Sequence, residues 1–339
     1  MMKNLLIVGP AWVGDMVMAQ TLFRLLHAQQ PNVQIDVLAP DWTSALLSRM
    51  PEVRSTISFP FKHGELRLKD RYQFAKTLRE RAYSEAIVLP NSFKSALIPW
   101  FAGIPKRTGW LGEARFWLLN DARRLDKARY PLMIERFMAL GLPAGAPLPP
   151  LCDYYPQFHV TAADTAATAA RLGVSFAEKP VLAMCPGAEF GPSKRWVPAY
   201  YAAVASQKIK EGWAVWLFGS AKDKAVTAEI MSLTENQCVD LSGRCQLPEA
   251  IDLFAGVKGV LTNDSGLLHV AAALNRPAIA VYGSTSPDFT PPLSPKATVL
   301  KLNLPCQPCF KRECPLQHHR CMRDITPPMV LDAMQAWES

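Results

Sequence analysis

Short apolar runs alternate with amphipathic stretches of helical period along most of the 339-residue chain. Apolar runs of about 4–8 residues bounded by Gly, Pro, Asn or Asp are typical of buried strands, whereas longer stretches with apolar residues three or four apart are typical of helices. Strands and helices that alternate in this way favour an α/β fold with mainly parallel sheets.

The same pattern assigns most elements. In the first half it predicts strands at 5–8, 34–39, 53–59 and 85–89, and helices at 16–27, 42–48, 72–81, 92–102 and 130–140. In the second half it predicts strands at 181–185, 213–218, 238–241, 259–262 and 277–282, and helices at 162–172, 198–210, 224–233, 248–255, from 267 onward, and 328–337.

A stretch rich in Pro and Gly, GLPAGAPLPPL at residues 141–151, separates the two series. This composition is typical of a semi-rigid linker, and the chain is longer than one hydrophobic core usually supports. Each half opens with a strand, a Gly-containing loop and a helix, which predicts two Rossmann-like domains facing each other across a cleft. We place the domains at residues 1–155 and 156–325.

The stretch from Gly259 to Ala273, GVLTNDSGLLHVAAA, predicts a strand that enters a helix with almost no loop. The first amides of such a helix and its dipole favour an anion beyond the strand end, typically a phosphate. Asp264 or Ser265 is a candidate cap, Gly266 permits close approach of a ligand, and His269 lies one turn along. A capped core helix without a ligand is the structural alternative.

Two further loops follow predicted strands. Ser193 and Lys194, in GAEFGPSKR, offer a hydroxyl and an ammonium to a phosphate, although the loop lacks the Walker spacing and is otherwise a solvated basic loop. Gly14 and Asp15 begin the first helix, in GPAWVGD, which is not a dinucleotide fingerprint. Asp15 is either a helix cap or a carboxylate able to take a proton from an attacking hydroxyl.

The composition narrows the class of partner and compartment. The chain has a net charge of +8, which implies an acidic partner, but its basic residues are scattered and form no nucleic-acid module. No apolar run approaches the roughly 18 residues that span a bilayer, and the first twelve residues are too short for a signal peptide. We therefore expect a cytoplasmic protein that binds a small anionic ligand and an anionic surface.

Four of the eight cysteines crowd near the end of the chain, with two histidines among them: Cys306, Cys309, Cys314, Cys321, His318 and His319. Four thiolates can hold zinc, but zinc sites usually pair two C-x2-C knuckles and only one is present. We favour reduced thiols in an ordered loop and expect neither a metal nor another cofactor.

Three motifs in this order resemble those of the ADP-heptose:lipopolysaccharide heptosyltransferases: GPAWVGDMVMAQTLFRLL, PGAEFGPSKRW and LTNDSGLLHVAAAL. The terminal PCQPCFKRECPLQHHRCM is similar to the type II members of that family. The resemblance implies a GT-B fold, with acceptor on the N-terminal domain and nucleotide sugar on the C-terminal one. It also implies that the C-terminal helix, within residues 326–339, packs back on the first domain.

The resemblance further implies inverting, metal-independent transfer of heptose from ADP-heptose to the first heptose of the lipopolysaccharide inner core, heptosyl-Kdo-lipid A. Asp15 matches the family's proposed base. Lys194 matches its diphosphate contact, and the loop of Asp264, Ser265, Gly266 and His269 matches its nucleotide-sugar loop. Asp223 lies near a family residue that contacts the ribose, with a loose local match.

An ionised Asp264 facing a diphosphate would repel it, so we expect its side chain to cap or brace the loop while the amides of Ser265 and Gly266 face the phosphate. Gly14 and the basic residues of the first half are expected at the acceptor, although solvated surface charge is the alternative for each cation. These cations are Lys62, Lys69, Lys94, Arg115 and Arg123.

We expect a monomer in peripheral contact with the inner face of the cytoplasmic membrane, where anionic lipids attract cations. Three alternatives remain open from sequence. One is the type I step, with Kdo-lipid A as acceptor. The second is a nucleotide-sugar epimerase built from similar Rossmann halves, and the third is a non-catalytic binding protein that retains the fold.

Overall fold

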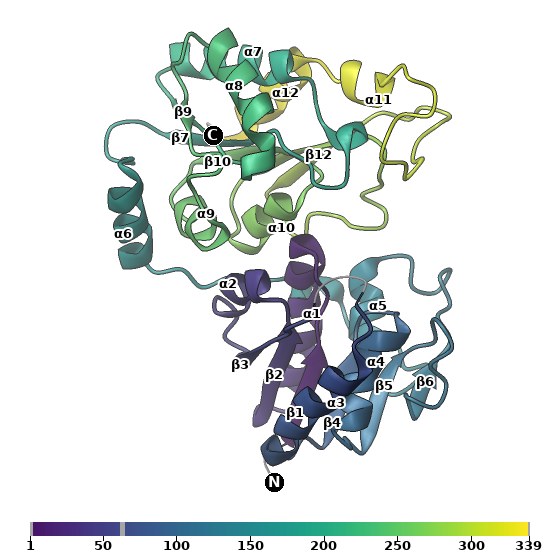
Figure 1. Cartoon of the computed structure of the whole chain (residues 1–339). Coiled ribbons are helices and arrows are strands. Elements are labelled where there is room, and N and C mark those ends of the chain that lie inside the picture. Colours follow the sequence, from purple (N-terminus) through teal and green to yellow (C-terminus); the bar gives the residue numbers. More distant parts are fainter. Residues whose placement is uncertain (1–2, 62–64, 338–339) are drawn as a thin grey trace. The chain divides into compact units, whose positions relative to one another are not determined.

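The computed structural model describes residues 3–61 and 65–337 of the chain (Figure 1). The chain divides into two compact units, Met1–Pro156 and Gln157–Ser339. Each unit contains a six-stranded sheet in which the paired strands run parallel, with a helix between most successive strands. The predicted pair of α/β halves is therefore present.

The first unit has the strand order β3-β2-β1-β4-β5-β6. Its strands are β1 (Lys3–Val8), β2 (Val33–Ala39), β3 (Val53–Ser58), β4 (Glu85–Val88), β5 (Lys106–Trp110) and β6 (Asp121–Arg123). Its helices are α1 (Val13–Gln29), α2 (Ser44–Leu47), α3 (Leu68–Thr77), α4 (Phe93–Phe101) and α5 (Met133–Leu140). The central β1 pairs with β2 on one side and β4 on the other, so its apolar run is buried.

The second unit has the order β12-β11-β10-β7-β8-β9. Its strands are β7 (Val181–Cys185), β8 (Ala214–Leu217), β9 (Val239–Asp240), β10 (Gly259–Asn263), β11 (Ala278–Tyr282) and β12 (Ala297–Lys301). Its helices are α6 (Ala162–Leu172), α7 (Pro198–Lys210), α8 (Lys224–Leu233), α9 (Leu247–Phe254), α10 (Gly266–Ala273), α11 (Arg320–Arg323) and α12 (Pro327–Met334).

Both sheets share one topology, because the strand order reverses beside β1 and β4 in the first unit and beside β7 and β10 in the second. In open α/β sheets ligands bind beyond the carboxyl ends of the strands at such a reversal. The loops that leave these four strands are therefore the structural candidates for a site. They include three loops already singled out by their sequence.

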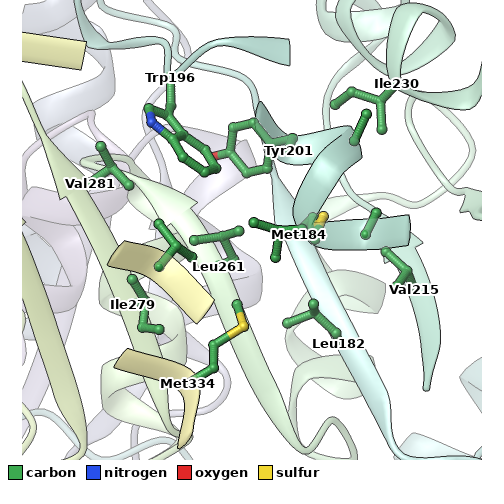
Figure 2. Packing of buried hydrophobic residues seen from close by; sticks show 14 of the residues in the cluster. Leu182, Met184, Trp196, Tyr201, Val215, Ile230, Leu261, Ile279, Val281 and Met334 are labelled. Carbon is green, nitrogen blue, oxygen red and sulfur yellow. The ribbon is translucent and has the colours of Figure 1, made fainter. Parts of the chain in front are cut away.

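The C-terminal helix α12 contributes its apolar side chains to the core of the second unit, and its expected packing on the first domain stays a prediction. Val330 and Met334 of α12 and Trp337 after it belong to the core of the second unit (Figure 2 shows Met334 beside Leu261 and Ile279). The physical reason is the apolar face of α12, which covers the sheet of its own unit beside α7 and β11.

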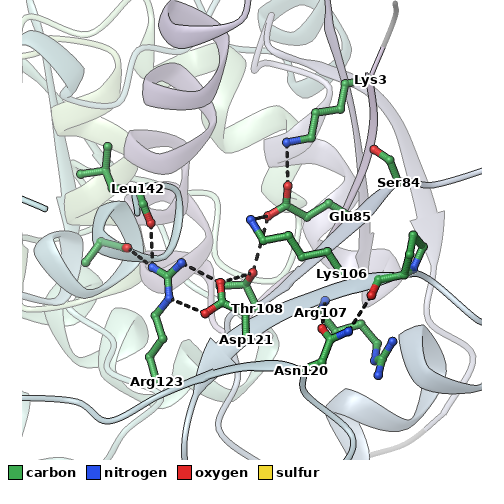
Figure 3. Close-up of polar contacts among 12 residues, drawn as sticks. Lys3, Ser84, Glu85, Lys106, Arg107, Thr108, Asn120, Asp121, Arg123 and Leu142 are labelled. Atoms are coloured by element: carbon green, nitrogen blue, oxygen red, sulfur yellow. Dashed lines mark hydrogen bonds and ion pairs between the residues drawn. The ribbon is translucent and has the colours of Figure 1, made fainter. Parts of the chain in front are cut away.

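Three edge or near-edge strands escaped the sequence prediction: β5, β6 and β12. β5 reads KRTGW and β6 reads DAR, and neither has a run of apolar residues. In β5 and β4, Lys106 and Glu85 form a cross-strand ion pair of 2.8 Å, which replaces apolar contact at the sheet surface (Figure 3).

A buried carboxylate joins the strands of the first sheet. Asp36 of β2 accepts hydrogen bonds from Arg54, Arg81 and the Tyr83 hydroxyl at 2.6–3.0 Å. Burial alone would raise the pKa of Asp36, but the bonds from Arg54, Tyr83 and Ser55 outweigh it and hold the pKa at about 2. The group is therefore ionised inside the fold.

Candidate active site

Asn263, the last residue of β10, holds the loop that leaves β7. Its side chain is fully buried. The amide oxygen accepts from the Trp196 backbone N–H at 2.9 Å, and the amide nitrogen donates to the Pro186 carbonyl at 2.8 Å. Asn263 therefore joins both ends of the loop to the neighbouring strand. The sequence pattern included Asn263 in a polar run but assigned it no role.

Lys194 and Asp264 form an ion pair between these two loops. The Lys194 ammonium lies 2.6 Å from Oδ2 of Asp264, and the Thr285 hydroxyl donates to the same oxygen at 2.5 Å. The side chains are 15% and 5% exposed, so solvent screens the pair weakly. Asp264 thus holds the Lys194 ammonium, whereas the sequence predicted that its side chain would cap or brace its own loop. Thr285 was not foreseen.

The N-terminus of α10 lies next to this pair. Ser265 is the N-cap residue in an extended conformation, but its side chain makes no capping hydrogen bond, so the expectation of a capping Ser265 is wrong. Its hydroxyl lies 3.1 Å from that of Thr262 instead. The helix therefore presents its first amides, beginning at Gly266, and the positive end of its dipole without a side-chain cap.

His269 follows one turn into α10 and is buried. Burial lowers its pKa to about 4, against the opposing influence of the Asp264 carboxylate. The imidazole is therefore neutral at physiological pH. In that form it can donate or accept one hydrogen bond but adds no charge to an anion site.

Ser193 does not occupy the phosphate-gripping position expected of it. Its hydroxyl is buried, lies 2.9 Å from the Ser284 hydroxyl and donates to the Lys311 carbonyl at 2.5 Å. The reason is packing, because the loop of Ser193 is covered by the segment around Lys311 and Arg312, and the Ser193 N–H donates to the Arg312 carbonyl. Ser193 therefore positions the loop of Lys194.

Arg312, whose carbonyl accepts from the Ser193 N–H, was not singled out from the sequence. The ammonium of Lys194 lies 5.1 Å, and the guanidinium carbon of Arg312 5.7 Å, from the ring centroid of Phe190. A side chain at Gly191 would place its Cβ 2.6 Å from the Arg312 carbonyl oxygen, so glycine permits the approach. Two cations therefore share one aromatic ring beside the ion pair.

The cysteine-rich segment surrounds a cavity of about 20 Å³. The lining includes Cys306, Cys309, Cys314, Cys321, His318 and His319. Burial, together with the three neighbouring thiols, raises the pKa of Cys321 to about 11. Among residues 3–61 and 65–337, no three His, Cys, Asp or Glu side chains are placed to hold one metal ion.

Asp223 lies against the β7 loop. A Cβ added to Gly187 would come within 2.4 Å of the Asp223 carboxyl carbon, and one added to Gly219 within 2.9 Å of its Cβ. The carboxylate accepts from the N–H and the hydroxyl of Ser220 at 2.9 and 2.8 Å, in a capping box. Because neither glycine has a side chain, Asp223 can lie close to both of them at the carboxyl edge of the sheet.

In the first unit, Asp15 lies in the first turn of α1, beyond the end of β1. The N-cap residue of α1 is Trp12, so the alternative that Asp15 is simply the cap is wrong. Gly14 and Asp15 are both half-buried. A carboxylate in a first turn is stabilised as an anion by the helix dipole.

Three comparisons with known proteins bear on this geometry. A profile of glycosyltransferase family 9 (heptosyltransferase) matches residues 71–320. Lipopolysaccharide heptosyltransferase 2 of Escherichia coli K12 is 49% identical, with 98% of each chain covered. Lipooligosaccharide heptosyltransferase 2 of Haemophilus influenzae is 47% identical with the same coverage. The solved structure of E. coli ADP-heptose lps heptosyltransferase II has a TM-score of 0.88 at 47% identity, covering 99% of this chain and 98% of that one.

The chain belongs to glycosyltransferase family 9. It is a glycosyltransferase of the heptosyltransferase kind, and its two sheets are those of the GT-B fold. None of the described helices is both long and apolar enough to cross a membrane.

Two of the basic residues assigned to the acceptor belong to the framework of this heptosyltransferase. Arg115 is fully buried and donates to the carbonyls of Pro90 and Trp110 at 2.6 and 2.5 Å. Arg123 contacts Asp121 at 2.7 Å and donates to the Leu142 carbonyl at 2.8 Å (Figure 3). These bonds hold both guanidinium groups within the first unit. The expectation that Arg115 and Arg123 contact the acceptor is therefore corrected.

The remaining cations differ in placement. Lys69 is exposed on α3, and Lys94 is half-buried in the first turn of α4, just after the strand-order reversal at β4. Lys62 lies outside the described residues. Lys69 and Lys94 therefore stay as acceptor candidates.

Proposed function

We propose that this enzyme transfers L-glycero-D-manno-heptose from ADP-heptose to the first heptose of the lipopolysaccharide inner core. The observation that carries the proposal is the 49% identity to lipopolysaccharide heptosyltransferase 2 over 98% of both chains. The name of the solved E. coli relative includes ADP-heptose, which supports the choice of donor. In this proposal the second unit binds the donor and the first unit binds the acceptor.

The donor diphosphate lies beyond β7 and β10, at the N-terminus of α10. Three features support this position: the Lys194 ammonium held by Asp264 at 2.6 Å, the uncapped amides of Ser265 and Gly266, and the reversal of strand order. Lysine has three donors, so Lys194 can keep its bond to Asp264 and still contact a phosphate. The neutral His269 lies one turn into α10, behind the same loop, and in this proposal Asp223 faces the nucleoside at the β7 edge.

Asp15 acts as the general base. It takes the proton of the acceptor hydroxyl as the hydroxyl oxygen attacks the anomeric carbon from the face opposite the diphosphate. The bond from that carbon to the ADP oxygen breaks in the same displacement, which inverts the anomeric centre. Lys194 and the α10 amides stabilise the charge that accumulates on ADP. The scheme uses no metal or other cofactor.

The acceptor is heptosyl-Kdo-lipid A, and Gly14, Lys69 and Lys94 contact it. We place the enzyme in the cytoplasm, as a monomer in peripheral contact with the inner face of the cytoplasmic membrane. The net charge of +8 supports this contact, since each cation near an anionic leaflet contributes about 1 kcal/mol of attraction.

The proposal is tested with the full chain, ADP-heptose and two purified acceptors, Kdo-lipid A and heptosyl-Kdo-lipid A. Transfer to the second acceptor alone supports the type II step, whereas transfer to the first establishes type I. The variant Asp15→Asn should lose about 10²–10⁴-fold in kcat while binding ADP-heptose with unchanged affinity in calorimetry. Wild-type kcat in Asp15→Asn would remove the base assignment.

A further inference from the structure

A continuous row of aromatic rings crosses α3, α4 and the segment 111–120 of the first unit. The ring of Tyr72 lies 5.4 Å from that of Phe101, which lies 5.0 Å from Trp100. Trp117 is 6.1 Å from both Trp100 and Phe93. We call these five residues and the adjoining Phe116 the aromatic face. α3 and α4 pack side by side beneath it (Figure 1).

Four of the six residues of the aromatic face are exposed, and Phe93 and Phe101 are partly buried against the core. Phe116 and Trp117 are 66% and 62% exposed, and Trp100 and Tyr72 are each 38% exposed. Leu68, the first residue of α3, is also exposed and lies one turn before Tyr72. Single exposed apolar residues are normal on a protein surface, but a connected group of this kind marks an interaction site.

Cations adjoin the rings. The Lys76 ammonium lies 4.7 Å from the centre of the Tyr72 ring, and Arg79 donates to the Phe101 carbonyl at 2.9 Å. Residues 65–81 contain six Lys or Arg and three Asp or Glu. Arg71 is buried and Arg81 is paired with Asp36, so four cations face three carboxylates and the surplus is +1. Of the acidic residues, Asp70 is paired with Arg67 at 2.6 Å. An apolar surface with this surplus complements an anionic partner.

We propose that the aromatic face is the surface by which the enzyme docks on an anionic lipid bilayer. Trp and Tyr have an apolar ring and a polar edge, and they concentrate at the headgroup level of membranes. Neighbouring Lys and Arg then meet the lipid phosphates. The choice of a bilayer over a protein partner rests on this charge surplus and on the proposed function, whose acceptor is anchored in a membrane.

The test measures sedimentation of the full chain with vesicles of phosphatidylethanolamine and phosphatidylglycerol. The wild type should bind them, and should bind vesicles of phosphatidylcholine weakly. The double variant Phe116→Ser with Trp117→Ser should lose roughly ten-fold or more in partition coefficient. Lys69→Gln with Lys76→Gln should bind more weakly and show less weakening with added salt. The matched control is Leu233→Ser, an exposed apolar residue of α8 in the second unit.

Transfer assays separate docking from folding and from the proposed function. With an acceptor freed of its acyl chains, the aromatic double variant should keep its wild-type rate, and with acceptor embedded in vesicles its rate should fall. Vesicle binding by the double variant equal to the wild type would refute docking through this face. So would a wild type that ignores vesicles but self-associates in a way that the double variant abolishes. A wild type that docks yet transfers heptose to neither acceptor would instead refute the proposed function.

Discussion

The pair of Lys194 and Asp264 allows stability and catalysis to be tested separately. The variant Lys194→Met removes the ammonium 2.6 Å from Asp264 but keeps much of the apolar stem beside Phe190. It leaves a carboxylate that is 5% exposed and that still accepts from the neutral Thr285 hydroxyl. An ionised group in that position is stabilised poorly.

Removing one partner of a buried ion pair costs about 3–5 kcal/mol, and the 15% exposure of the lysine places this pair near the lower limit. We therefore expect the second unit to lose about 3 kcal/mol of unfolding free energy. For a domain of this size each kcal/mol lowers Tm by roughly 2–4 °C, so Tm should fall by about 6–12 °C. Loss of a donor to the departing diphosphate should lower kcat by about 10²–10³-fold.

The double variant Lys194→Met with Asp264→Asn distinguishes the two effects. The amide that replaces the Asp264 carboxylate is neutral and can still accept from Thr285, so most of the lost Tm should return. The transfer rate should not return, because the cation for the diphosphate is still absent. The measurements are differential scanning calorimetry and steady-state transfer from ADP-heptose. Recovery of kcat in the double variant would refute the assignment of Lys194 to the diphosphate.

The single variant Asp264→Asn completes the cycle. If Asp264 only braces Lys194, this variant should lose part of kcat through misplacement of the ammonium, and its affinity for ADP should not improve. Full wild-type activity in Asp264→Asn would show that no ionised carboxylate is needed at this position.

Further predictions concern pH and packing. The pKa of Asp36 is lowered to about 2, so the ionised group stabilises the fold by ~2 kcal/mol above about pH 4, and this stabilisation is lost as the pH falls toward 2. The unfolding free energy of Asp36→Asn should therefore lack this dependence on pH. The pKa of His269 is lowered to about 4, so the unfolding free energy should fall by up to ~3 kcal/mol as the pH drops from about 6.5 toward 4. A His269→Gln variant with the same pH dependence would contradict the assignment of this loss to His269. Gly187→Ala would place a Cβ 2.4 Å from the Asp223 carboxyl carbon, so KM for ADP-heptose should rise with little change in kcat. The control is Gly212→Ala, where a Cβ meets nothing within 4 Å but φ is +86°; backbone strain should lower its Tm and leave KM unchanged.

Local pattern was sufficient for the elements that carry the site. The strand and helix around Gly259–Ala273 appear as β10 and α10, because a buried parallel strand needs an apolar run and the helix that follows needs its own period. The loops of Lys194 and Asp264 both follow predicted strands, and they meet because β7 pairs with β10 in the structure. The strands β5 and β6 were not predicted, because they lack an apolar run and their polar side chains find partners on neighbouring strands, as Lys106 does with Glu85 and Thr108 with Asp121. The edge strand β12 was also not predicted.

The sequence by itself determined the two α/β halves and the family, through three motifs whose spacing is local. Only the tertiary structure decided which partners individual polar side chains have. Arg115 and Arg123 donate to backbone carbonyls, and Ser193 holds a loop. Thr285 donates to Asp264, and Arg312 lies over the Phe190 ring that Lys194 also contacts. The physical reason is that the partner of a polar group is set by which segments pack together. A sequence pattern describes a side chain's chemistry, whereas the packing of the folded chain determines which group meets it.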